Sequence, residues 1–493
     1  MQRVSAGSVY NASMKIADLQ DKSVLILGLG LEGRSTLRYL RAAFPEKTLG
    51  LADQQPIEKL PSENLQLIER DPCLRLHLGD GYLESLADYE VIVKSPGIPV
   101  TISEYRRAVQ AGIEITSQTA LFFANFPGTI IGVTGTKGKS TTASLLHSIL
   151  KRSFPDAVLV GNIGVPPLDV LGKSEQRTGN GQIVVYELSS HQLEGLRQSP
   201  QIAILLNIVP EHLDYYESFE QYVAAKENIT RFQGGRDYLI YDSDHDLPRQ
   251  IAARSQACGL ACSLEEQRTP GCFLSGDSIV YRPALGEEEK VVAIRDVRLL
   301  GRFNLMNVAA AVAAARVVGV PASEIPEAIW NFQPLEHRLE RVGTYGGVTY
   351  YNDSIATVPE ATIAALDTLG KDVETILLGG TDRGLDFSDL AARLLRSGIK
   401  TVILFPPSGQ RIWKAFCEQA AASDEPTARK SARRGYPLPQ HFFVSTMEEA
   451  VALAKQRTGK GKICLQSPAS PSFGLFRDYR ERGEAFKRLV REG

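Results

Sequence analysis

Cysteine clusters, an excess of charge of one sign and long apolar runs are all missing from this chain of 493 residues. Its six cysteines are scattered and form no Cys-x-x-Cys pair, so we expect free thiols and no cysteine-bound metal. Lysine and arginine (55) nearly balance aspartate and glutamate (57). No global charge therefore attracts nucleic acid or an anionic membrane surface.

The apolar runs all end short of the roughly 18 residues that a membrane helix needs, and the N-terminal residues carry no apolar signal-peptide region. We therefore expect a cytoplasmic protein with no membrane insertion and no nucleic-acid partner. The hydrophobic fraction of 43% and the charged fraction of 23% are ordinary for a globular protein. The length predicts about three domains.

The most informative motif is an apolar run at 129–133 that leads into a glycine-rich turn and then a helical apolar stripe. The turn reads Gly135, Thr136, Lys137, Gly138, Lys139, Ser140, Thr141. The backbone N–H groups of such a turn bind phosphate, the lysine before the serine reaches the β and γ oxygens, and a hydroxyl can hold Mg²⁺. The sequence predicts a nucleoside triphosphate site, in a short version of the loop in which Val133 stands at the usual first glycine.

Short apolar runs alternate with helical patterns along the whole chain, which indicates an α/β protein. We divide it into an N-terminal extension at 1–20 and domains at 21–125, 126–334 and 335–493. The strands expected are 24–27, 91–93, 130–133, 158–160, 183–186, 202–206, 238–241, 348–351, 375–378, 401–405 and 463–465. The helices expected are 36–43, 103–111, 304–318, 390–396 and 447–456. The basic, proline-bearing segment 424–440 is interpreted as a solvated loop.

The first domain carries a Gly-x-Gly-x-x-Gly turn from Gly28 to Gly33, and Asp53 follows 20 residues later. This pattern is typical of a dinucleotide site, although it requires only a pyrophosphate at a helix N-terminus. We expect a nucleotide other than NAD. Ser95 and Gly97 follow another strand and would lie at the same ligand-binding edge of the sheet.

Three side chains near the strand ends of the middle domain suit phosphoryl chemistry. Glu187 ends an apolar strand and offers a carboxylate to Mg²⁺, and His212 follows the next strand. Lys226 lies on the helix that comes after it. A lysine held beside metal ions can be neutral despite its ordinary pKa near 10.4, and could then form a carbamate.

Taken together, these motifs resemble the Mur ligases in order and spacing over nearly the whole chain. Further matching positions are Asn162, Ser189, Gln192, Glu211, Asn304, Asn307, His337, Arg338, Asn352, Asp353 and Ser354. The tail at 467–486 is similar to the glutamate-adding branch of that family. The resemblance implies a three-domain α/β architecture with a Rossmann-like UDP domain, a central P-loop ATPase domain and a C-terminal Rossmann-like domain.

The resemblance also implies an activity. A Mur ligase of this branch joins glutamate, with D-glutamate favoured, to UDP-N-acetylmuramoyl-L-alanine in peptidoglycan precursor synthesis, using ATP, two Mg²⁺ ions and an acyl-phosphate intermediate. No partner protein is needed, so a monomer is expected.

Each site residue takes its role from the same resemblance. The implied catalytic residues are Lys139, Glu187, His212 and Lys226. The metal ligands are Ser140, Glu187, His212 and Lys226 as a carbamate. ATP would be bound by Gly135, Thr136, Lys137, Gly138, Lys139, Ser140, Thr141, Asn304, Asn307, His337, Arg338 and Asp353. The UDP-sugar would contact Gly30, Leu31, Asp53, Ser95, Gly97, Asn162, Ser189 and Gln192. The amino acid would contact Thr357, Arg383, Ser472, Phe473 and Tyr479.

Several positions depart from the family pattern. Ile355 and Arg383 stand where lysines are usual, Tyr479 where phenylalanine is common, and Glu32 and Gln54 where small or hydroxylated residues are frequent. The first two leave open ligation of L-glutamate or another amino acid. Other classes considered are a P-loop regulator without ligase activity, an NAD oxidoreductase that uses the first glycine turn, and a folylpolyglutamate synthase, which should lack the leading UDP domain.

Overall fold

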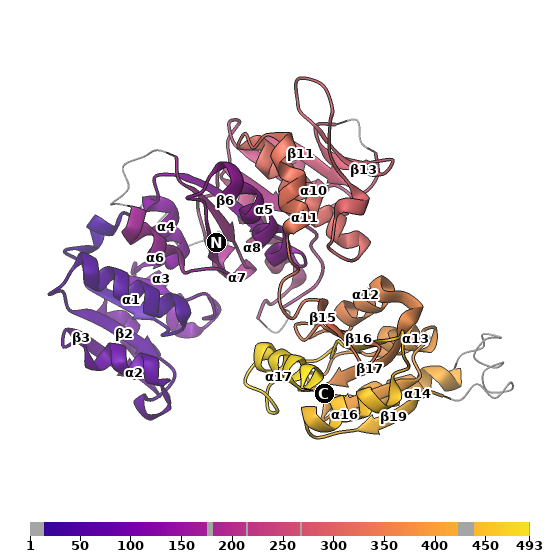
Figure 1. Cartoon of the computed structure of the whole chain (residues 1–493). Helices are drawn as coiled ribbons and strands as arrows, with labels where there is room; N and C mark the ends of the chain where they lie inside the picture. The colour runs from indigo at the N-terminus through magenta and orange to yellow at the C-terminus, as the bar shows by residue number, and fades with distance from the viewer. Residues whose placement is uncertain (1–13, 175–180, 213–214, 267–268, 423–437, 493) are drawn as a thin grey trace. The chain divides into compact units, whose positions relative to one another are not determined.

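The computed structural model describes residues 14–174, 181–212, 215–266, 269–422 and 438–492. They form two compact units (Figure 1). The first unit holds Met1–Val297 and Leu305–Phe332, and the second holds Arg298–Asn304 and Gln333–Gly493.

The first unit begins with a five-stranded sheet in the order β3-β2-β1-β4-β5, in which all neighbouring strands are parallel. Its strands are β1 (Val24–Leu27), β2 (Leu49–Asp53), β3 (Leu74–Leu78), β4 (Val91–Lys94) and β5 (Glu114–Ser117). The connecting elements are α1 (Leu31–Ala43), η2 (Ile57–Lys59), α2 (Ser62–Glu69), η3 (Tyr82–Asp88), α3 (Ser103–Gln110) and α4 (Gln118–Asn125). The central strands β1 and β4 are buried along their whole length, as expected of a parallel sheet covered on both faces.

A nine-stranded sheet follows in the same unit, in the order β14-β13-β12-β11-β10-β9-β6-β8-β7. Its strands are β6 (Thr129–Thr134), β7 (Val158–Gly161), β8 (Ile183–Glu187), β9 (Ile202–Leu205), β10 (Tyr238–Asp242), β11 (Cys258–Ser263), β12 (Gly271–Ser275), β13 (Ser278–Arg282) and β14 (Glu289–Ala293). β12, β13 and β14 pair in antiparallel fashion, and the other pairs are parallel. The chain runs from β6 to one side and later to the other, so β6 lies at a topological switch point, where α/β sheets bind ligands.

The helices of this second sheet are α5 (Lys139–Ser153), α6 (Pro167–Ser174), α7 (Ser190–Leu193), α8 (Phe219–Arg231), α9 (Asp246–Ala252), η4 (Ile294–Asp296), α10 (Arg302–Val317), η5 (Ala322–Glu324) and α11 (Ile325–Asn331). α5 buries the apolar stripe that the sequence predicts, including Leu145, Leu146 and Ile149. Contacts with α6 join the two sheets of the unit, since Ser35 on α1 donates a 2.7 Å hydrogen bond to Asp169. One hydrophobic core therefore includes residues from both sheets.

Residues 14–19 of the expected N-terminal extension fold against the first unit. The short helix η1 (Ile16–Leu19) places Leu19 in the core beside Met14, and both side chains are buried. Asn125 at the end of α4 accepts a 3.1 Å hydrogen bond from the Ile16 backbone. Residues 1–13 lie outside the described residues.

The second unit is built on a six-stranded sheet in the order β15-β16-β20-β17-β18-β19. Its strands are β15 (Glu340–Tyr345), β16 (Val348–Asn352), β17 (Val373–Gly379), β18 (Thr401–Phe405), β19 (Gln440–Phe443) and β20 (Ile463–Gln466). Its helices are α12 (Pro359–Leu369), η6 (Gly370–Asp372), α13 (Ser388–Leu395), α14 (Ser408–Ala422), α16 (Met447–Arg457) and α17 (Tyr479–Arg491). Only β15 runs antiparallel to its neighbour. Two apolar cores pack against this sheet.

Every strand and helix expected from the sequence is present, with ends shifted by a few residues. The sequence did not predict β2, β3, β5, the strands from β11 to β15, or β19. The last of these starts at Gln440, which the sequence placed in a solvated loop; residues 423–437 of that loop lie outside the described residues. β19 was missed because its four residues are mostly exposed at a sheet edge and so show no buried apolar run.

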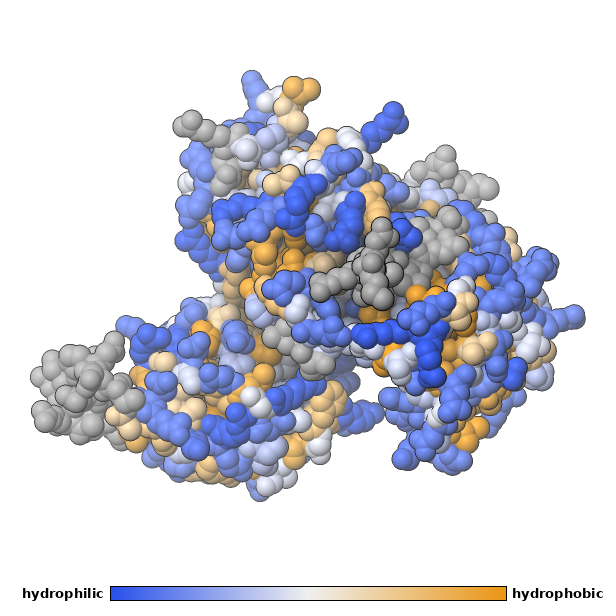
Figure 2. Space-filling view, turned by 180° about the vertical axis from the view of Figure 1, so that it is seen from behind, coloured by the Kyte–Doolittle hydropathy of each residue, from blue (hydrophilic) through white to orange (hydrophobic). Residues whose placement is uncertain are grey.

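None of the helices among the described residues is long and apolar enough to span a membrane. On the face seen in Figure 2, hydrophilic residues predominate and hydrophobic residues form separate patches. The six cysteines are free, as expected.

Candidate active site

The glycine-rich turn links the end of β6 to the start of α5. Gly138 precedes the helix with a φ of 88°, a left-handed conformation that glycine adopts without strain. A Cβ at this position would lie 2.2 Å from Oδ1 of Asn307, so a larger residue would also collide with α10. The turn thus presents the N-terminus of α5 and its free N–H groups at the switch point of the sheet.

Lys139 curls back over the turn. Its Nζ donates hydrogen bonds to the carbonyl oxygens of Gly135, at 3.0 Å, and Thr136, at 2.9 Å. The hydroxyl of Thr136 is in turn 2.9 Å from the hydroxyl of Tyr222 and accepts a 3.0 Å bond from the Val209 backbone. The charged amine is therefore held within the turn, where it can meet phosphate oxygens.

Glu187 lies at the end of β8, in register with Val133 of β6. Its side chain is fully buried, and its Oε1 accepts hydrogen bonds from Ser140 Oγ, at 3.1 Å, and Asn162 Nδ2, at 3.2 Å. Its Oε2 is buried with no hydrogen-bond partner among the described residues. A buried carboxylate oxygen beside a hydroxyl is a donor set that suits Mg²⁺, so these residues fit the metal that the family resemblance implies.

Lys226 on α8 is almost completely buried, with 1% of its surface exposed. Its Nζ donates a 2.7 Å hydrogen bond to the carbonyl oxygen of Gly135 and lies 4.8 Å from the ring centre of Tyr222. Burial, together with the nearby cation of Lys139, holds the pKa of Lys226 well below its ordinary value. Burial therefore favours the free amine that carbamate formation requires.

His212 lies in the loop after β9 with a φ of 58°, which is unusual for a residue other than glycine. Its ring lies 4.9 Å from that of His191 and 6.3 Å from that of Tyr222. Burial acts to raise the pKa of its neighbour Glu211, but the 2.6 Å ion pair with Lys137 and the nearby charges of Lys139 and His212 together lower it. The ring of Tyr222 thus lies near both His212 and Lys226.

A cavity of about 460 Å³ opens at the carboxyl edge of the first sheet. The expected UDP-sugar residues that line it are Gly30, Leu31, Asp53, Ser95, Gly97 and Asn162. Gln192, on α7, reaches this wall through a 2.6 Å hydrogen bond from its Nε2 to Glu32 Oε1, and Ser189 caps the same helix. The structure therefore gathers these eight residues around one region of the first unit.

The glycine turn of the first domain brings helix and strand close together. A Cβ on Gly33 would lie 1.9 Å from the carbonyl oxygen of Gly28, so only glycine fits. Asp53 at the end of β2 accepts hydrogen bonds from the backbone N–H of Leu29, at 2.7 Å, and of Gln55, at 2.9 Å. These bonds hold the turn in place at the cavity wall.

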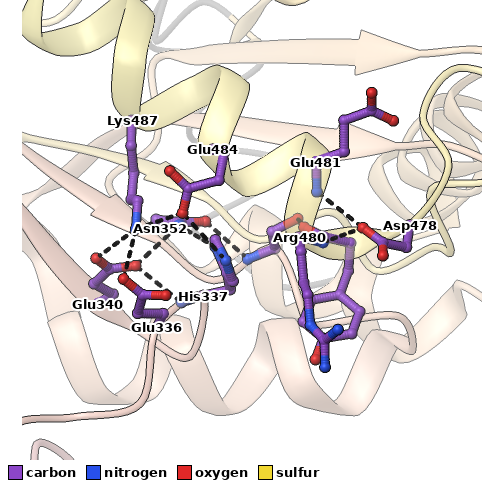
Figure 3. Close-up of polar contacts among 11 residues, drawn as sticks. Glu336, His337, Glu340, Asn352, Asp478, Arg480, Glu481, Glu484 and Lys487 are labelled. Carbon is purple, nitrogen blue, oxygen red and sulfur yellow. Dashed lines mark hydrogen bonds and ion pairs between the residues drawn. The ribbon is translucent and has the colours of Figure 1, made fainter. Parts of the chain in front are cut away.

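In the second unit, His337 and Leu339 have φ values of 63° and 45°, so the turn that carries Arg338 is strained. Figure 3 shows Glu336 and His337 facing Glu484 and Lys487 of α17. Asn352 Nδ2 donates a 2.9 Å hydrogen bond to His337 Nδ1, which fixes the proton of a neutral ring on Nε2. Burial, followed by the charge of Lys487, lowers the pKa of His337.

Three possible metal ligands, Glu336, His337 and Glu484, converge in that cluster. Lys487 already occupies its centre, with ion pairs of 3.4 Å to Glu336, 3.2 Å to Glu340 and 2.8 Å to Glu484. The side chain of Lys487 is buried, so its ammonium balances the carboxylates. We interpret the cluster as a support for the strained turn and for the N-terminal half of α17.

Asp353 follows β16 and is buried. It accepts hydrogen bonds from Ser467 Oγ, at 2.8 Å, and from the Leu339 backbone, at 3.0 Å. Burial raises its pKa to about 7, although these bonds and nearby Arg338 and Arg482 act in the opposite direction. Asn304 groups with this unit, where its Nδ2 donates to the Leu300 carbonyl at 2.6 Å, whereas Asn307 accepts a 3.2 Å bond from Thr142 in the first unit.

The residues expected to bind the amino-acid substrate lie in the second unit, in separate groups. The guanidinium of Arg383 lies 6.0 Å from the ring centre of Phe473, while Ser472 is buried. The carbonyl oxygen of Tyr479 accepts a 2.7 Å bond from Ser354, and its ring lies 6.0 Å from that of His337. Thr357 is half-buried just before α12.

Two residues that contact the phosphate turn were not singled out from the sequence. Tyr222 touches Thr136, His212 and Lys226, and Asn207 accepts a 2.7 Å bond from the Thr136 backbone on its carbonyl. Asn207 lies two residues after strand β9, so its place near the end of a strand was an available signal. No pattern in the sequence marked Tyr222, because its contacts depend on how α8 packs against the turn.

Three family models match the chain. They are the "Mur ligase MurD-like, N-terminal domain" at residues 22–117, the "Mur ligase middle domain" at 133–315 and the "Mur ligase, glutamate ligase domain" at 337–470. A curated relative named UDP-N-acetylmuramoylalanine–D-glutamate ligase from Symbiobacterium thermophilum is 34% identical over 476 residues, covering 96% of this chain and 98% of the relative. A relative of the same name from a Roseiflexus species is 34% identical, with coverages of 96% and 99%.

Solved structures agree on the fold. MurC from Thermotoga maritima has a TM-score of 0.57 at 16% identity and covers 96% of this chain and 99% of its own. MurF from the same organism, solved in complex with ADP, has a TM-score of 0.53 at 17% identity and full coverage of both chains. The three-domain α/β architecture expected from the motifs is confirmed, and the chain belongs to the Mur ligase family.

Proposed function

We propose that this Mur ligase joins D-glutamate to UDP-N-acetylmuramoyl-L-alanine, with ATP as the energy source, in the synthesis of peptidoglycan precursors. The curated relatives that match it over nearly their full length carry that activity in their names. ATP would phosphorylate the L-alanyl carboxylate, the amine of glutamate would attack the acyl phosphate, and the tetrahedral intermediate would expel phosphate.

One observation carries the proposal: the Glu187 carboxylate joins the phosphate turn to the first-domain cavity. Its Oε1 accepts from Ser140, on the turn, and from Asn162, which lines the cavity. Phosphoryl transfer to a carboxylate requires the γ-phosphate and the substrate carboxylate to meet. A UDP-sugar in the cavity and ATP on the turn would meet at this carboxylate.

Lys139 and the N-terminus of α5 supply positive charge where the transferring phosphoryl group gains negative charge. Ser140, Glu187, His212 and Lys226 as a carbamate would hold two Mg²⁺ ions, which when bound neutralise the phosphate charge. Carbamate formation converts Lys226 from a cation into an anion, and its lowered pKa supports that step.

The remaining roles are assigned by the same proposal. Gly135, Thr136, Lys137, Gly138, Thr141 and Asn307 of the first unit would bind ATP, as would Asn304, His337, Arg338 and Asp353 of the second. Gly30, Leu31, Asp53, Ser95, Gly97, Asn162, Ser189 and Gln192 would bind the UDP-sugar. Thr357, Arg383, Ser472, Phe473 and Tyr479 would bind glutamate. By the same proposal, the protein acts in the cytoplasm as a monomer.

A second candidate, ligation of L-glutamate to the same UDP-sugar, follows from Arg383 and Ile355. The planar guanidinium of arginine binds a carboxylate through two hydrogen bonds, whereas the ammonium of the usual lysine acts as a point charge. Arg383 can therefore hold the α-carboxylate of the amino acid in a different orientation. Arg383 also lies over the exposed ring of Phe473, which would direct that fork.

The test supplies UDP-N-acetylmuramoyl-L-alanine, ATP and Mg²⁺ with D-glutamate or L-glutamate separately, and measures phosphate release and the ligated product. Turnover with D-glutamate supports the proposal, and turnover with L-glutamate alone supports the second candidate. If neither amino acid gives a product, the assignment as a glutamate ligase is wrong.

A further inference from the structure

An acidic residue occupies the helix N-terminus where the UDP-sugar is expected to bind. Glu32 is the second residue of α1, which begins after Gly30, and it lines the cavity of about 460 Å³. A helix N-terminus attracts anions, and UDP-N-acetylmuramoyl-L-alanine carries a diphosphate and a carboxylate. An ionised Glu32 would repel either group.

The carboxyl group of Glu32 is only half satisfied. Its Oε1 accepts the 2.6 Å hydrogen bond from Gln192, whereas Oε2 is buried with no hydrogen-bond partner among the described residues. The backbone around it is anchored, because Gln118 Nε2 donates to the Glu32 carbonyl oxygen at 2.9 Å. One oxygen is thus held in place, while the other is buried without a partner on a residue that lines the cavity.

The charged and titratable groups packed around Glu32 leave it poorly compensated. Lys94 of β4 is the nearby cation, but its Nζ already donates to the carbonyl oxygens of Ser95, at 3.2 Å, and Ile98, at 2.6 Å. The hydroxyl of Tyr186, on β8, lies 2.9 Å from that of Thr119. Glu194, beyond α7, accepts a 2.7 Å hydrogen bond from the hydroxyl of Tyr215.

Burial raises the pKa of Glu32 to about 7, although the bond from Gln192 and the charge of Lys94 oppose it. Burial also lowers the pKa of Lys94 to about 8 and raises that of Glu194. Lys94 is therefore a second group that could titrate in the same range, and the test must separate the two.

We propose that Glu32 is a positioning residue for the UDP-sugar: in its carboxylic acid form its carboxyl group donates a hydrogen bond to an oxygen of the ligand, and the protein takes up a proton as the ligand binds. This inference rests on the proposed function, which assigns the cavity to the UDP-sugar. Protonation replaces a repulsion between two anions with a hydrogen bond, and the proton comes from solvent. The ligand thereby binds with a pH dependence that a small or hydroxylated residue at this position would not produce.

The test is calorimetric titration of the full chain with UDP-N-acetylmuramoyl-L-alanine between pH 6 and pH 8.5, in two buffers of different ionisation enthalpy. The difference in heat between the buffers counts the protons taken up. We expect uptake to rise towards one proton at high pH and to vanish near pH 6. The affinity should fall by up to about tenfold per pH unit above pH 7, the limit for a single linked proton. This measurement needs no variant.

The variant Glu32→Gln keeps a hydrogen-bond donor and removes the titration. It should bind with an affinity independent of pH and without proton uptake, while Glu58→Gln, which removes an exposed carboxylate from η2, should behave as the parent does. Uptake that persists in Glu32→Gln would assign the proton to another group such as Lys94 and overturn the inference. Tight binding without uptake in the parent would overturn it too, and leave the proposed function standing. Failure to bind at every pH would overturn both.

Discussion

The Nζ of Lys226 lies 2.7 Å from the carbonyl oxygen of Gly135, so helix α8 is tied to the phosphate turn by a buried lysine. A buried ammonium is costly, and the lowered pKa of Lys226 is the expected response to burial and to the charge of Lys139. A carbamate keeps one N–H on the same nitrogen. Modification of the lysine can therefore preserve the bond to Gly135 while adding a carboxylate beside the turn.

Replacement of Lys226 tests that modification. We expect Lys226→Ala to lose most of its turnover, on the order of 10²-fold or more, because a group that supports charge in the transition state is removed. Short carboxylates such as formate or acetate, added to the assay of phosphate release, should restore part of the activity. Exposed Lys151→Ala on α5 is the control and should be unaffected. Full activity of Lys226→Ala without any additive would remove the carbamate from the mechanism.

Lys139→Ala should abolish turnover with little change in fold. The side chain donates hydrogen bonds to the carbonyl oxygens of Gly135 and Thr136, and its loss would remove the cation proposed to face the transferring phosphoryl group. A drop in kcat of about 10³-fold or more is expected from phosphate-release kinetics, with a circular dichroism spectrum unchanged from that of the parent. Retention of more than a tenth of the activity would contradict the role of Lys139.

Glu187→Gln should uncouple nucleotide binding from Mg²⁺. The buried carboxylate offers Oε2 to a cation, whereas an amide of the same shape carries no charge. The unfolding temperature of the parent should increase when ATP and Mg²⁺ are added together. The Mg²⁺-dependent part of this increase should disappear in the variant. An equal increment in both proteins would place the metal elsewhere.

Arg383→Ala should weaken the binding of glutamate without weakening that of ATP. The guanidinium lies over Phe473 in the second unit, where it can hold a carboxylate. We expect KM for glutamate to rise at least about tenfold while KM for ATP stays within about twofold. Arg393→Ala on α13, whose partner is Asp367, is the matched control. Equal changes in both KM values would indicate a structural role for Arg383.

The buried carboxyl of Asp353 should make the stability of the second unit depend on pH. Its folded pKa of about 7 lies above the reference value of 3.8, so between these values the folded state binds more protons than the unfolded one. The contribution is therefore fully present below pH 4 and is lost as pH rises through about 7, by an amount on the order of 4 kcal/mol.

Urea unfolding followed by Trp413 fluorescence measures this dependence, in a Trp330→Phe background because the chain has two tryptophans. The difference in unfolding free energy between the parent and Asp353→Asn should shift in favour of the variant from pH 4 to pH 8. A difference that stays constant across this range would contradict the raised pKa of Asp353.

Much of the site could be predicted because it follows the strand ends. Glu187 ends a buried parallel strand, and Gly138 and Lys139 lie in the turn that follows another. Such strand ends meet at one edge of a sheet, so local pattern placed these residues together. The exposed or short strands β15 and β19 carry little apolar pattern and were missed. Tyr222 was missed for another reason, since its contacts depend on how α8 packs.

The sequence by itself determined the α/β class, the phosphate turn and the order of the family's motifs, because apolar periodicity and glycine spacing are local properties of the chain. Only the tertiary structure decided that Glu187 joins Ser140 to Asn162 and that Lys226 is buried beside Gly135. It also decided that Glu32 faces Gln192 with one oxygen unpaired. Burial and hydrogen bonding between distant segments shift pKa values, and neither can be read from neighbours in the sequence.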